Sequence, residues 1–430
     1  MPSEIFCGEK KSPSDPSLTP PLSLSLSSYF FFTQGEESVL AANLPAKHNV
    51  NGDASIPELK GRPASILESH KNSTFIDCDV DPNSDSILAV TSAGNLCSFS
   101  TTTHLMEKWV SLETKAGSSI SVSSSCIAAG GANGCVRLFN SSDLKYEGTL
   151  PLPPSLDTVF DGDKGVMPAK TAESNKVSVP DVVCLKFLDG GQKLATIYSD
   201  NSLFIWDVSN KQNIGKYRSF LHHSGPIWDI QCLPSKSSGT VANAQLGLQV
   251  SPSHKEEAAD DRLPENSFVT CSSDQTIRFW NLGTPGRAKI NHPKWKNLFS
   301  KDMIGVICRD MAAAGKENDD CDGKPDIPES EISQRTEPAD ALRSLAVHPD
   351  RGDLACGDRS GNVFIYDVNH MKFARKVAAH DNEVLSLTYS KNDLLASASR
   401  DKLVHIFDTN DDYRRFSSLD NHGSSVTSVK

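Results

Sequence analysis

The chain reads SFVTCSSDQTIRFWN from Ser267 to Asn281, two runs of strand-forming residues joined by a polar tetrad. In each run, residues with high β-propensity alternate with others, and a period of two is that of a strand with one buried face. The tetrad between the runs has the composition of a tight turn. The stretch is therefore predicted to be an antiparallel hairpin, in which Asp274 lies in the turn and Trp280 ends the second strand six residues later.

The same six-residue interval between a turn residue and an aromatic residue recurs along the chain. Where two such units adjoin directly, 40 residues separate Phe99 from Phe139 and 41 residues separate Tyr366 from Phe407. A repeat of about 40–45 residues that contains four short strands is typical of a β-propeller blade. The six intervals run from Ala93 to Phe99, Asn133 to Phe139, Asp200 to Trp206, Asp274 to Trp280, Ser360 to Tyr366 and Asp401 to Phe407.

Polar insertions account for the longer spacing between the other repeats. Residues 151–180 carry several prolines, residues 234–266 are rich in Ser, Ala and Gln, and residues 283–340 contain an acidic run. Such compositions are typical of solvated loops and linkers. The predicted fold is therefore all-β, a β-propeller with about six visible blades of four antiparallel strands and the start of a seventh blade between His422 and Lys430.

The overall composition restricts the classes of partner. The chain has 430 residues and a formal net charge of −11. An acidic surface disfavours general binding to nucleic acid or to anionic membranes, and no apolar run approaches the roughly 18 residues of a membrane-spanning helix. The 11 cysteines are scattered without a C-x-x-C pair. This pattern indicates reduced cysteines in a cytosolic or nuclear protein rather than a zinc site or a disulfide framework.

Residues 1–60 differ from the repeats because they are rich in Ser, Pro and Leu. Their acidic start and many prolines are poor features for a signal peptide, and we expect a disordered segment. Ser-Pro and Thr-Pro pairs here and in the insertions are candidate acceptors for a proline-directed kinase, since such segments are accessible. These candidate phosphorylation sites are Ser12, Thr19, Ser251 and Thr284.

The sequence has no recognised pattern for catalysis, a cofactor or a metal ion. It contains neither the G-x-x-x-x-G-K-[ST] phosphate cradle nor the G-x-S-x-G nucleophile turn. Acidic runs at 161–165 and 319–323 lack the loop with a closing Glu that binds calcium. We therefore expect a non-enzymatic protein without a cofactor. A propeller hydrolase stays an alternative that requires carboxylates and histidines converging on the central channel, and a nucleic-acid reader requires a basic face with exposed aromatic residues.

The dipeptide at the end of the third strand carries a family resemblance. It reads Trp206-Asp207 in one repeat and Trp280-Asn281 in another, and a histidine precedes several first strands. On these residues the chain resembles the WD-repeat proteins. Trp228-Asp229 is a false match, because it lies in a first strand. The other variants of the dipeptide are Tyr366-Asp367 and Phe407-Asp408, and the histidines are His223, His380 and His422.

In the WD-repeat family a His, a Ser or Thr, the turn Asp and the Trp form a hydrogen-bonded chain within a blade. The chemistry is reasonable, because a buried carboxylate needs a donor and a buried indole N–H needs an acceptor. Phe407 has no N–H, so one set is incomplete. By position, the resemblance implies a network of His223, Thr270, Asp274 and Trp280 in one blade, His380, Ser397 and Asp401 in a second, and Asp200 and Trp206 in a third.

A narrower resemblance covers roughly residues 61–430. The runs GDRSGN at 357–362 and LASASRDK at 395–402 are similar to those of the mitogen-activated-protein-kinase-binding WD-repeat scaffolds. That family has two joined propellers and a long C-terminal tail in which kinase docking is placed. The resemblance implies a chain truncated at both ends, with residues 61–310 as later blades of a first propeller, residues 311–340 as an acidic linker and residues 341–430 as the start of a second propeller.

The same resemblance implies a non-enzymatic scaffold for protein–protein interactions in mitogen-activated protein kinase signalling. Its expected partners are kinase pathway components and microtubule or spindle-pole proteins, with no nucleic acid and no membrane. The expected location is the cytoplasm, including the cytoskeleton or spindle pole, and a nuclear location stays open. The alternative is a WD-repeat adaptor of another complex.

Overall fold

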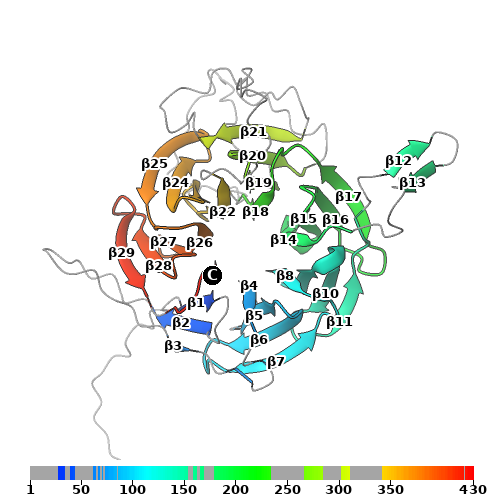
Figure 1. Cartoon of the computed structure of the whole chain (residues 1–430), viewed down its shortest axis with the longest axis horizontal. Coiled ribbons are helices and arrows are strands. Elements are labelled where there is room, and N and C mark those ends of the chain that lie inside the picture. The colour runs from blue at the N-terminus through cyan, green and yellow to red at the C-terminus, as the bar shows by residue number, and fades with distance from the viewer. Residues whose placement is uncertain are drawn as a thin grey trace, which may run out of the picture.

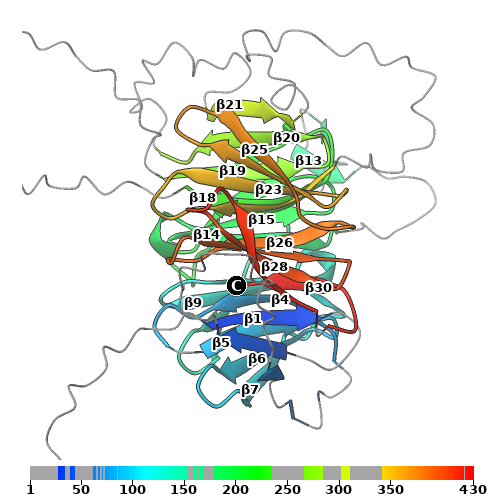
Figure 2. The same ribbon diagram turned by 90° about the vertical axis from the view of Figure 1, so that its left-hand side faces the viewer.

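The strands of this chain form a closed ring of blades. The computed structural model describes residues 28–33, 39–43, 62–63, 66–67, 70, 73–84, 86–153, 158–161, 165–168, 179–233, 266–283, 302–309, 341–420 and 422–430. Its strands form seven four-stranded antiparallel sheets around a central channel (Figure 1). Figure 2 shows the same ring turned on its side, with neighbouring blades packed face to face. The architecture is the all-β propeller that the repeat spacing predicts.

Six of the blades are each built from four strands that follow one another in the chain, with the innermost strand first. Most connections between these strands are short, which suits the alternating pattern and polar turns of each repeat, whereas those from β18 to β19 and from β20 to β21 are longer and include undescribed residues. The blades are β4 (Phe75–Val80), β5 (Ser86–Thr91), β6 (Asn95–Ser100) and β7 (Met106–Ser111); β8 (Gly117–Val122), β9 (Cys126–Gly131), β10 (Val136–Asn140) and β11 (Tyr146–Thr149); β14 (Val182–Leu188), β15 (Lys193–Tyr198), β16 (Leu203–Asp207) and β17 (Gly215–Phe220); β18 (Ile227–Cys232), β19 (Ser267–Ser272), β20 (Thr276–Asn281) and β21 (Met303–Cys308); β22 (Leu342–Val347), β23 (Asp353–Asp358), β24 (Asn362–Asp367) and β25 (Lys372–Ala378); and β26 (Val384–Tyr389), β27 (Leu394–Ser399), β28 (Val404–Asp408) and β29 (Arg414–Leu419).

The seventh blade joins distant parts of the chain. Its innermost strand is β30 (Val426–Val429), and the other three are β1 (Ser28–Thr33), β2 (Val39–Asn43) and β3 (Arg62–Pro63). The backbone of Phe31 is paired with that of Val429, and β1 pairs in turn with β2. The segment expected to be disordered, residues 1–60, therefore contributes two strands to the ring, and its other residues lie outside the described part of the chain.

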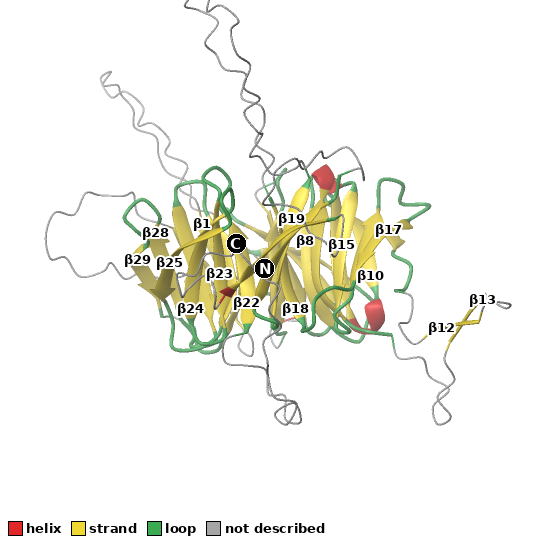
Figure 3. Cartoon of the chain, turned by 90° about the horizontal axis from the view of Figure 1, so that it is seen from above, coloured by secondary structure: helices red, strands yellow, loops and turns green. Residues whose placement is uncertain are grey.

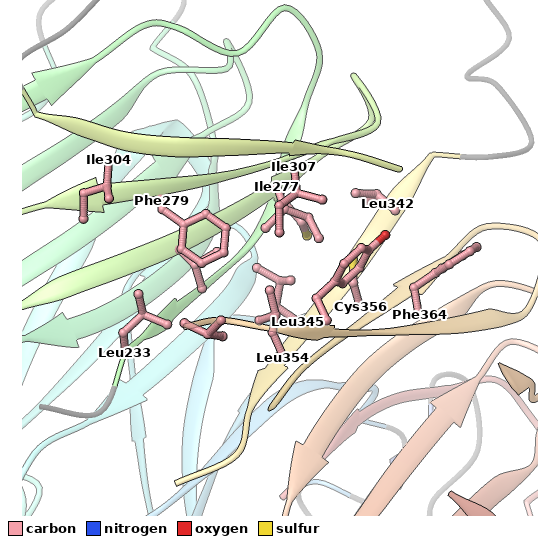
Figure 4. Close-up of a cluster of buried hydrophobic side chains, with 14 residues drawn as sticks. Leu233, Ile277, Phe279, Ile304, Ile307, Leu342, Leu345, Leu354, Cys356 and Phe364 are labelled. Atoms are coloured by element: carbon pink, nitrogen blue, oxygen red, sulfur yellow. The ribbon is translucent and has the colours of Figure 1, made fainter. Parts of the chain in front are cut away.

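All of these blades belong to one ring, which differs from the two joined propellers that we expected. β22, which follows the acidic stretch, packs against β18 and β19, which precede it. Figure 4 shows Ile277 and Phe279 of one blade close to Leu345 of the next, within a single buried apolar cluster. Apolar faces on both sides of the stretch are thus buried against each other. The boundaries expected at residues 60, 310 and 340 fall on undescribed residues and stay predictions.

Each innermost strand contains a β-bulge near its start, where one extra residue interrupts the pairing with the second strand. A bulge bends a strand and re-aims a side chain. The extra residues occupy equivalent positions in the seven blades and line one cavity of about 170 Å³ in the central channel. They are Ile76, Ser118, Val183, Trp228, Arg343, Leu385 and Thr427.

In six of the seven blades, the residue after the bulge forms a hydrogen bond with a neighbouring blade. Asp77 Oδ2 accepts from Ser119 Oγ at 3.0 Å and from the Ile120 amide at 3.1 Å. Ser428 Oγ donates to Asp77 Oδ1 at 3.0 Å, so the seventh blade is linked to the first described one. Equivalent bonds run from Leu185 N to Ser119 Oγ at 3.2 Å, from Leu345 N to Asp229 Oδ2 at 2.8 Å and from Val429 N to Ser386 Oγ at 3.2 Å.

Smaller elements lie outside the blade pattern. Two short 3-10 turns, η2 (Ala132–Gly134) and η3 (Asp189–Gly191), connect strands, and β12 (Thr158–Asp161) pairs with β13 (Gly165–Pro168) in a separate hairpin at the side of the ring (Figure 3). Within the described ranges, no helix has the length and apolar character needed to cross a membrane.

We expect Asp77→Ala to lower the free energy of unfolding by about 2–3 kcal/mol, because the substitution removes hydrogen bonds from two neighbouring blades to one carboxylate. Urea denaturation of the purified chain measures the effect. Asp350→Ala is the control, since Asp350 is exposed in a turn and such substitutions stay within about 0.5 kcal/mol. Equal midpoints for the two variants would show that the apolar layers alone hold the ring closed.

Candidate interaction surface

One face of the ring, here called the top face, is the face at which the innermost strands begin. Because successive strands of a blade are antiparallel, the loop before the first strand and the turn between the second and third strands lie on this face. Residues 221–226 and 379–383 are such loops, and residues 273–275 and 400–403 are such turns. Binding residues are often found on loops that a rigid scaffold positions, so the top face is a candidate interaction surface.

In the blade β18–β21, four side chains connect a top-face loop to a top-face turn. Trp280 Nε1 donates to Thr270 Oγ1 at 2.9 Å. Thr270 Oγ1 lies 2.8 Å from His223 Nε2, and His223 Nδ1 lies 2.8 Å from Asp274 Oδ2. Burial lowers the pKa of His223, so the neutral ring is favoured. With Nδ1–H donating to the carboxylate and the Thr270 hydroxyl donating to Nε2, every member of the chain is satisfied.

The Asp274 carboxylate is the centre of this network. It also accepts from the Ser224 amide at 3.2 Å and from the Thr276 amide and hydroxyl at 3.0 and 2.6 Å. Burial by itself would raise the pKa of Asp274, but the bonds from His223 and Thr276 and the charge of Arg278 lower that pKa to about 2. The carboxylate is therefore ionised at neutral pH and fixes the loop that precedes β18.

A related network in the blade β26–β29 uses a different closing group. His380 Nδ1 lies 2.9 Å from Asp401 Oδ2, and His380 Nε2 lies 2.7 Å from Ser397 Oγ. The imidazole of His405 stacks on that of His380 with ring centroids 4.4 Å apart, and its Nδ1 lies 2.8 Å from Ser418 Oγ. His405 is a supporting residue that the sequence reasoning missed, although it stands only two residues before Phe407 on β28.

The third expected set is not assembled in the same way. Asp200 accepts from the amide and hydroxyl of Ser202, at 3.0 and 2.6 Å, rather than from a histidine, and Trp206 is buried beside Phe204. In the blade β22–β25, the fully buried Asp358 accepts from the Ser360 and Asn362 amides at 2.9 and 2.7 Å. Asp358 stands eight residues before Tyr366, so a search at the six-residue interval finds Ser360 instead.

The structure does not test the other predicted sites. Ser12, Thr19, Ser251 and Thr284, the candidate phosphorylation sites, all lie outside the described residues. In the described part of the chain, no group of three or more His, Cys, Asp or Glu side chains is arranged to hold a metal ion.

Comparison with known proteins agrees with the blade geometry. Residues 258–281 and 371–408 match the family described as WD domain, G-beta repeat, and they include the turn carboxylates Asp274 and Asp401. The chain is a WD-repeat protein. Mitogen-activated protein kinase-binding protein 1 of Mus musculus is 34% identical to it over 410 residues, which cover 93% of this chain and 25% of that protein.

A second relative matches the chain to a similar extent. WD repeat-containing protein 62 of Sus scrofa is 34% identical over 417 residues, which cover 95% of this chain and 25% of that protein. The WD-repeat chain therefore spans about a quarter of the length of these curated relatives. Neither the matched family nor the names of these relatives indicate an enzyme family.

We expect Asp274→Ala to lower the free energy of unfolding by about 1.5–3 kcal/mol, the scale for losing hydrogen bonds to a charged group. Asp200→Ala is the matched control, because Asp200 occupies the same turn position but accepts hydrogen bonds only from Ser202 among the described residues of its blade. Chemical denaturation should show a smaller decrease in the free energy of unfolding for Asp200→Ala than for Asp274→Ala. A larger loss for Asp200→Ala than for Asp274→Ala would contradict a stabilising role for the histidine network.

The buried His405 should make stability depend on pH. Burial, and then the nearby His380 and Arg415, lower the pKa of His405 from 6.5 to about 4. The unfolded chain then binds the proton more readily, so this stability is present above pH 6.5 and is lost as the pH falls toward 4. When the pH falls from 7.5 to 5.0, the free energy of unfolding should decrease by about 1–2 kcal/mol less in His405→Gln than in the unsubstituted chain. Denaturation midpoints at the two pH values check this, and identical pH dependence would disprove it.

Proposed function

We propose that this WD-repeat chain is a non-enzymatic scaffold that brings together proteins of a mitogen-activated protein kinase pathway. The observation that carries the proposal is the 34% identity, over 93% of the chain, to a relative whose name states that it binds a mitogen-activated protein kinase. The similarity extends over the blades as a whole rather than over a single motif, so it supports a shared role of the ring.

The outer side of the ring offers a surface for such partners. Three adjacent blades expose an aromatic side chain on the outermost strand, namely Trp109 at 46%, Tyr146 at 51% and Tyr217 at 40%. Cations lie over two of these rings, with Arg137 5.7 Å from the Tyr146 centroid and Lys193 4.8 Å from that of Tyr217. Trp, Tyr and Arg are enriched at binding hot spots. We call these three aromatic residues the outer aromatic patch.

The proposed location is the cytoplasm, including the cytoskeleton and spindle pole. The nine cysteines in the described part of the chain are free thiols, which supports a reducing compartment. Fluorescence microscopy of the tagged chain in dividing cells checks the location, and accumulation in the secretory pathway would exclude it.

We expect the purified chain to bind a stress-activated kinase pathway protein with a Kd of about 1–10 µM, the range of a transient signalling contact. Surface plasmon resonance with a panel of purified kinases of the pathway measures this. A chain with Trp109→Ala, Tyr146→Ala and Tyr217→Ala should bind at least tenfold more weakly, because hot-spot aromatics carry much of the affinity.

Val80→Ala is the control for this experiment, since Val80 is an exposed apolar residue (42%) at the end of the innermost strand β4 and not on an outermost strand. Affinity for the panel no greater than that of an unrelated propeller would refute the kinase pathway assignment. Wild-type affinity in the triple variant would instead move the contact to another part of the ring.

A further inference from the structure

The central channel opens on the top face beside charged side chains from adjacent blades. Glu383, in the loop before β26, is buried, and its Oε1 accepts from Arg359 Nε. Arg400 Nη2 lies 3.4 Å and Arg343 Nη2 3.8 Å from Glu383 Oε2. One buried carboxylate is thus shared by three guanidinium groups from two blades.

Trp228 extends this cluster into a third blade. It is the bulge residue of β18, and Arg343 is the equivalent bulge residue of β22. The Arg343 guanidinium lies 3.6 Å from the centroid of the indole, and Trp228 Nε1 donates to Ser273 Oγ at 2.7 Å. The other bulge residues around the channel are uncharged: Ile76, Ser118, Val183, Leu385 and Thr427. Among the seven bulge residues of the described strands, Arg343 is therefore the only charged one.

Glu383 is less exposed than the three arginines that surround it. The side chain of Glu383 is 5% exposed, that of Arg343 16%, that of Arg359 32% and that of Arg400 52%. The shared carboxylate is therefore buried, while Arg359 and Arg400 are partly exposed to solvent. The formal charge of these four described side chains is +2, in a chain whose net charge is −11.

We propose that this channel-mouth cluster, Trp228, Arg343, Arg359, Glu383 and Arg400, binds a phosphorylated Ser or Thr side chain of a partner polypeptide. A phosphomonoester carries about −1.5 to −2 charges at pH 7, which matches a charge of +2, whereas a carboxylate carries only one. Guanidinium groups donate two parallel hydrogen bonds to phosphate oxygens. The half-buried Trp228 offers an apolar contact for a residue next to the phosphorylated one.

The proposal deepens the scaffold function, because it names the chemistry by which a partner would be recognised. Its test uses no kinase, so its failure leaves the kinase-binding experiment unaffected. The probes are three pools of fluorescein-labelled nonapeptides with randomised flanks and a central phosphoserine, serine or glutamate. Fluorescence anisotropy with the full 430-residue chain should show binding of the phosphoserine pool only.

Arg400→Ala should weaken binding of the phosphoserine pool at least tenfold, and Arg359→Ala should do the same. Arg414→Ala is the matched control, because Arg414 lies on the outermost strand of the same blade as Arg400 and is 77% exposed. It should bind like the unsubstituted chain. Thermal unfolding confirms that each variant is folded, and Arg400→Lys, which keeps the charge but loses the two-pronged geometry, replaces Arg400→Ala if that variant does not fold.

Several results would overturn the proposal. Equal binding of the serine and phosphoserine pools would exclude phosphate recognition, and equal binding of the glutamate pool would show a site for acidic peptides instead. Full competition by inorganic phosphate at the concentration of the peptide would mean that the polypeptide is not the occupant. Unchanged affinity in both arginine variants would place the bound peptide elsewhere on the ring.

Discussion

The pairing of β30 with β1 joins the two ends of the described chain, and the closed ring depends on it. A propeller blade buries its two faces against its neighbours, so an open ring would expose two apolar faces and an unpaired strand edge. Val429 pairs with Phe31 in the backbone ladder and contributes its buried side chain to the apolar layer beside β26–β29. Ser428 meanwhile donates to Asp77 of the neighbouring blade. Backbone pairing, apolar burial and a side-chain hydrogen bond therefore close the ring at the same place.

The same hydrogen bonds that stabilise individual blades also position the top face. Asp401 anchors His380 at the start of the loop before β26. In the adjoining turn, the Arg400 amide donates to the Glu383 carbonyl at 3.0 Å, and Ser399 Oγ donates to the Asn382 carbonyl at 3.1 Å. The loop with Glu383 and the turn with Arg400 are thus held together by backbone groups. Their side chains meet without depending on flexible loop conformations, which reduces the entropy lost when a ligand binds.

Much of each blade could be predicted from sequence because a blade consists of local hairpins. The interval from Asp274 to Trp280 marks the turn and third strand of its blade, and the same spacing locates the other five. The histidine partners also follow from the family pattern, since His223 and His380 lie at a similar place before their first strands. Contacts between segments that are far apart in the sequence could not be predicted in this way. The strands β1–β3 have an irregular composition, and nothing local to them specifies pairing with β30, about 400 residues later.

Two further features depend on distant segments. The resemblance implies two propellers, whereas the packing of β22 on β18 and β19 depends on apolar faces separated by an acidic stretch. Trp228 lies in the first strand β18, as the sequence predicts, and does not end a third strand. Its contact with Arg343, 115 residues away in sequence, arises only when neighbouring bulges face one channel.

The bulge also explains how this ring separates stability from recognition. The residue after the bulge is constrained in most blades, since Asp77, Ser119 and Asp229, for example, accept hydrogen bonds from the next blade. The bulge residue itself makes no ladder pair with the second strand and points into the channel. Its side chain can therefore differ between blades, from Val183 to Trp228 to Arg343, while the backbone geometry stays the same. Adjacent positions in one strand thus serve different purposes: one joins the blades, and the other sets the chemistry of the channel opening.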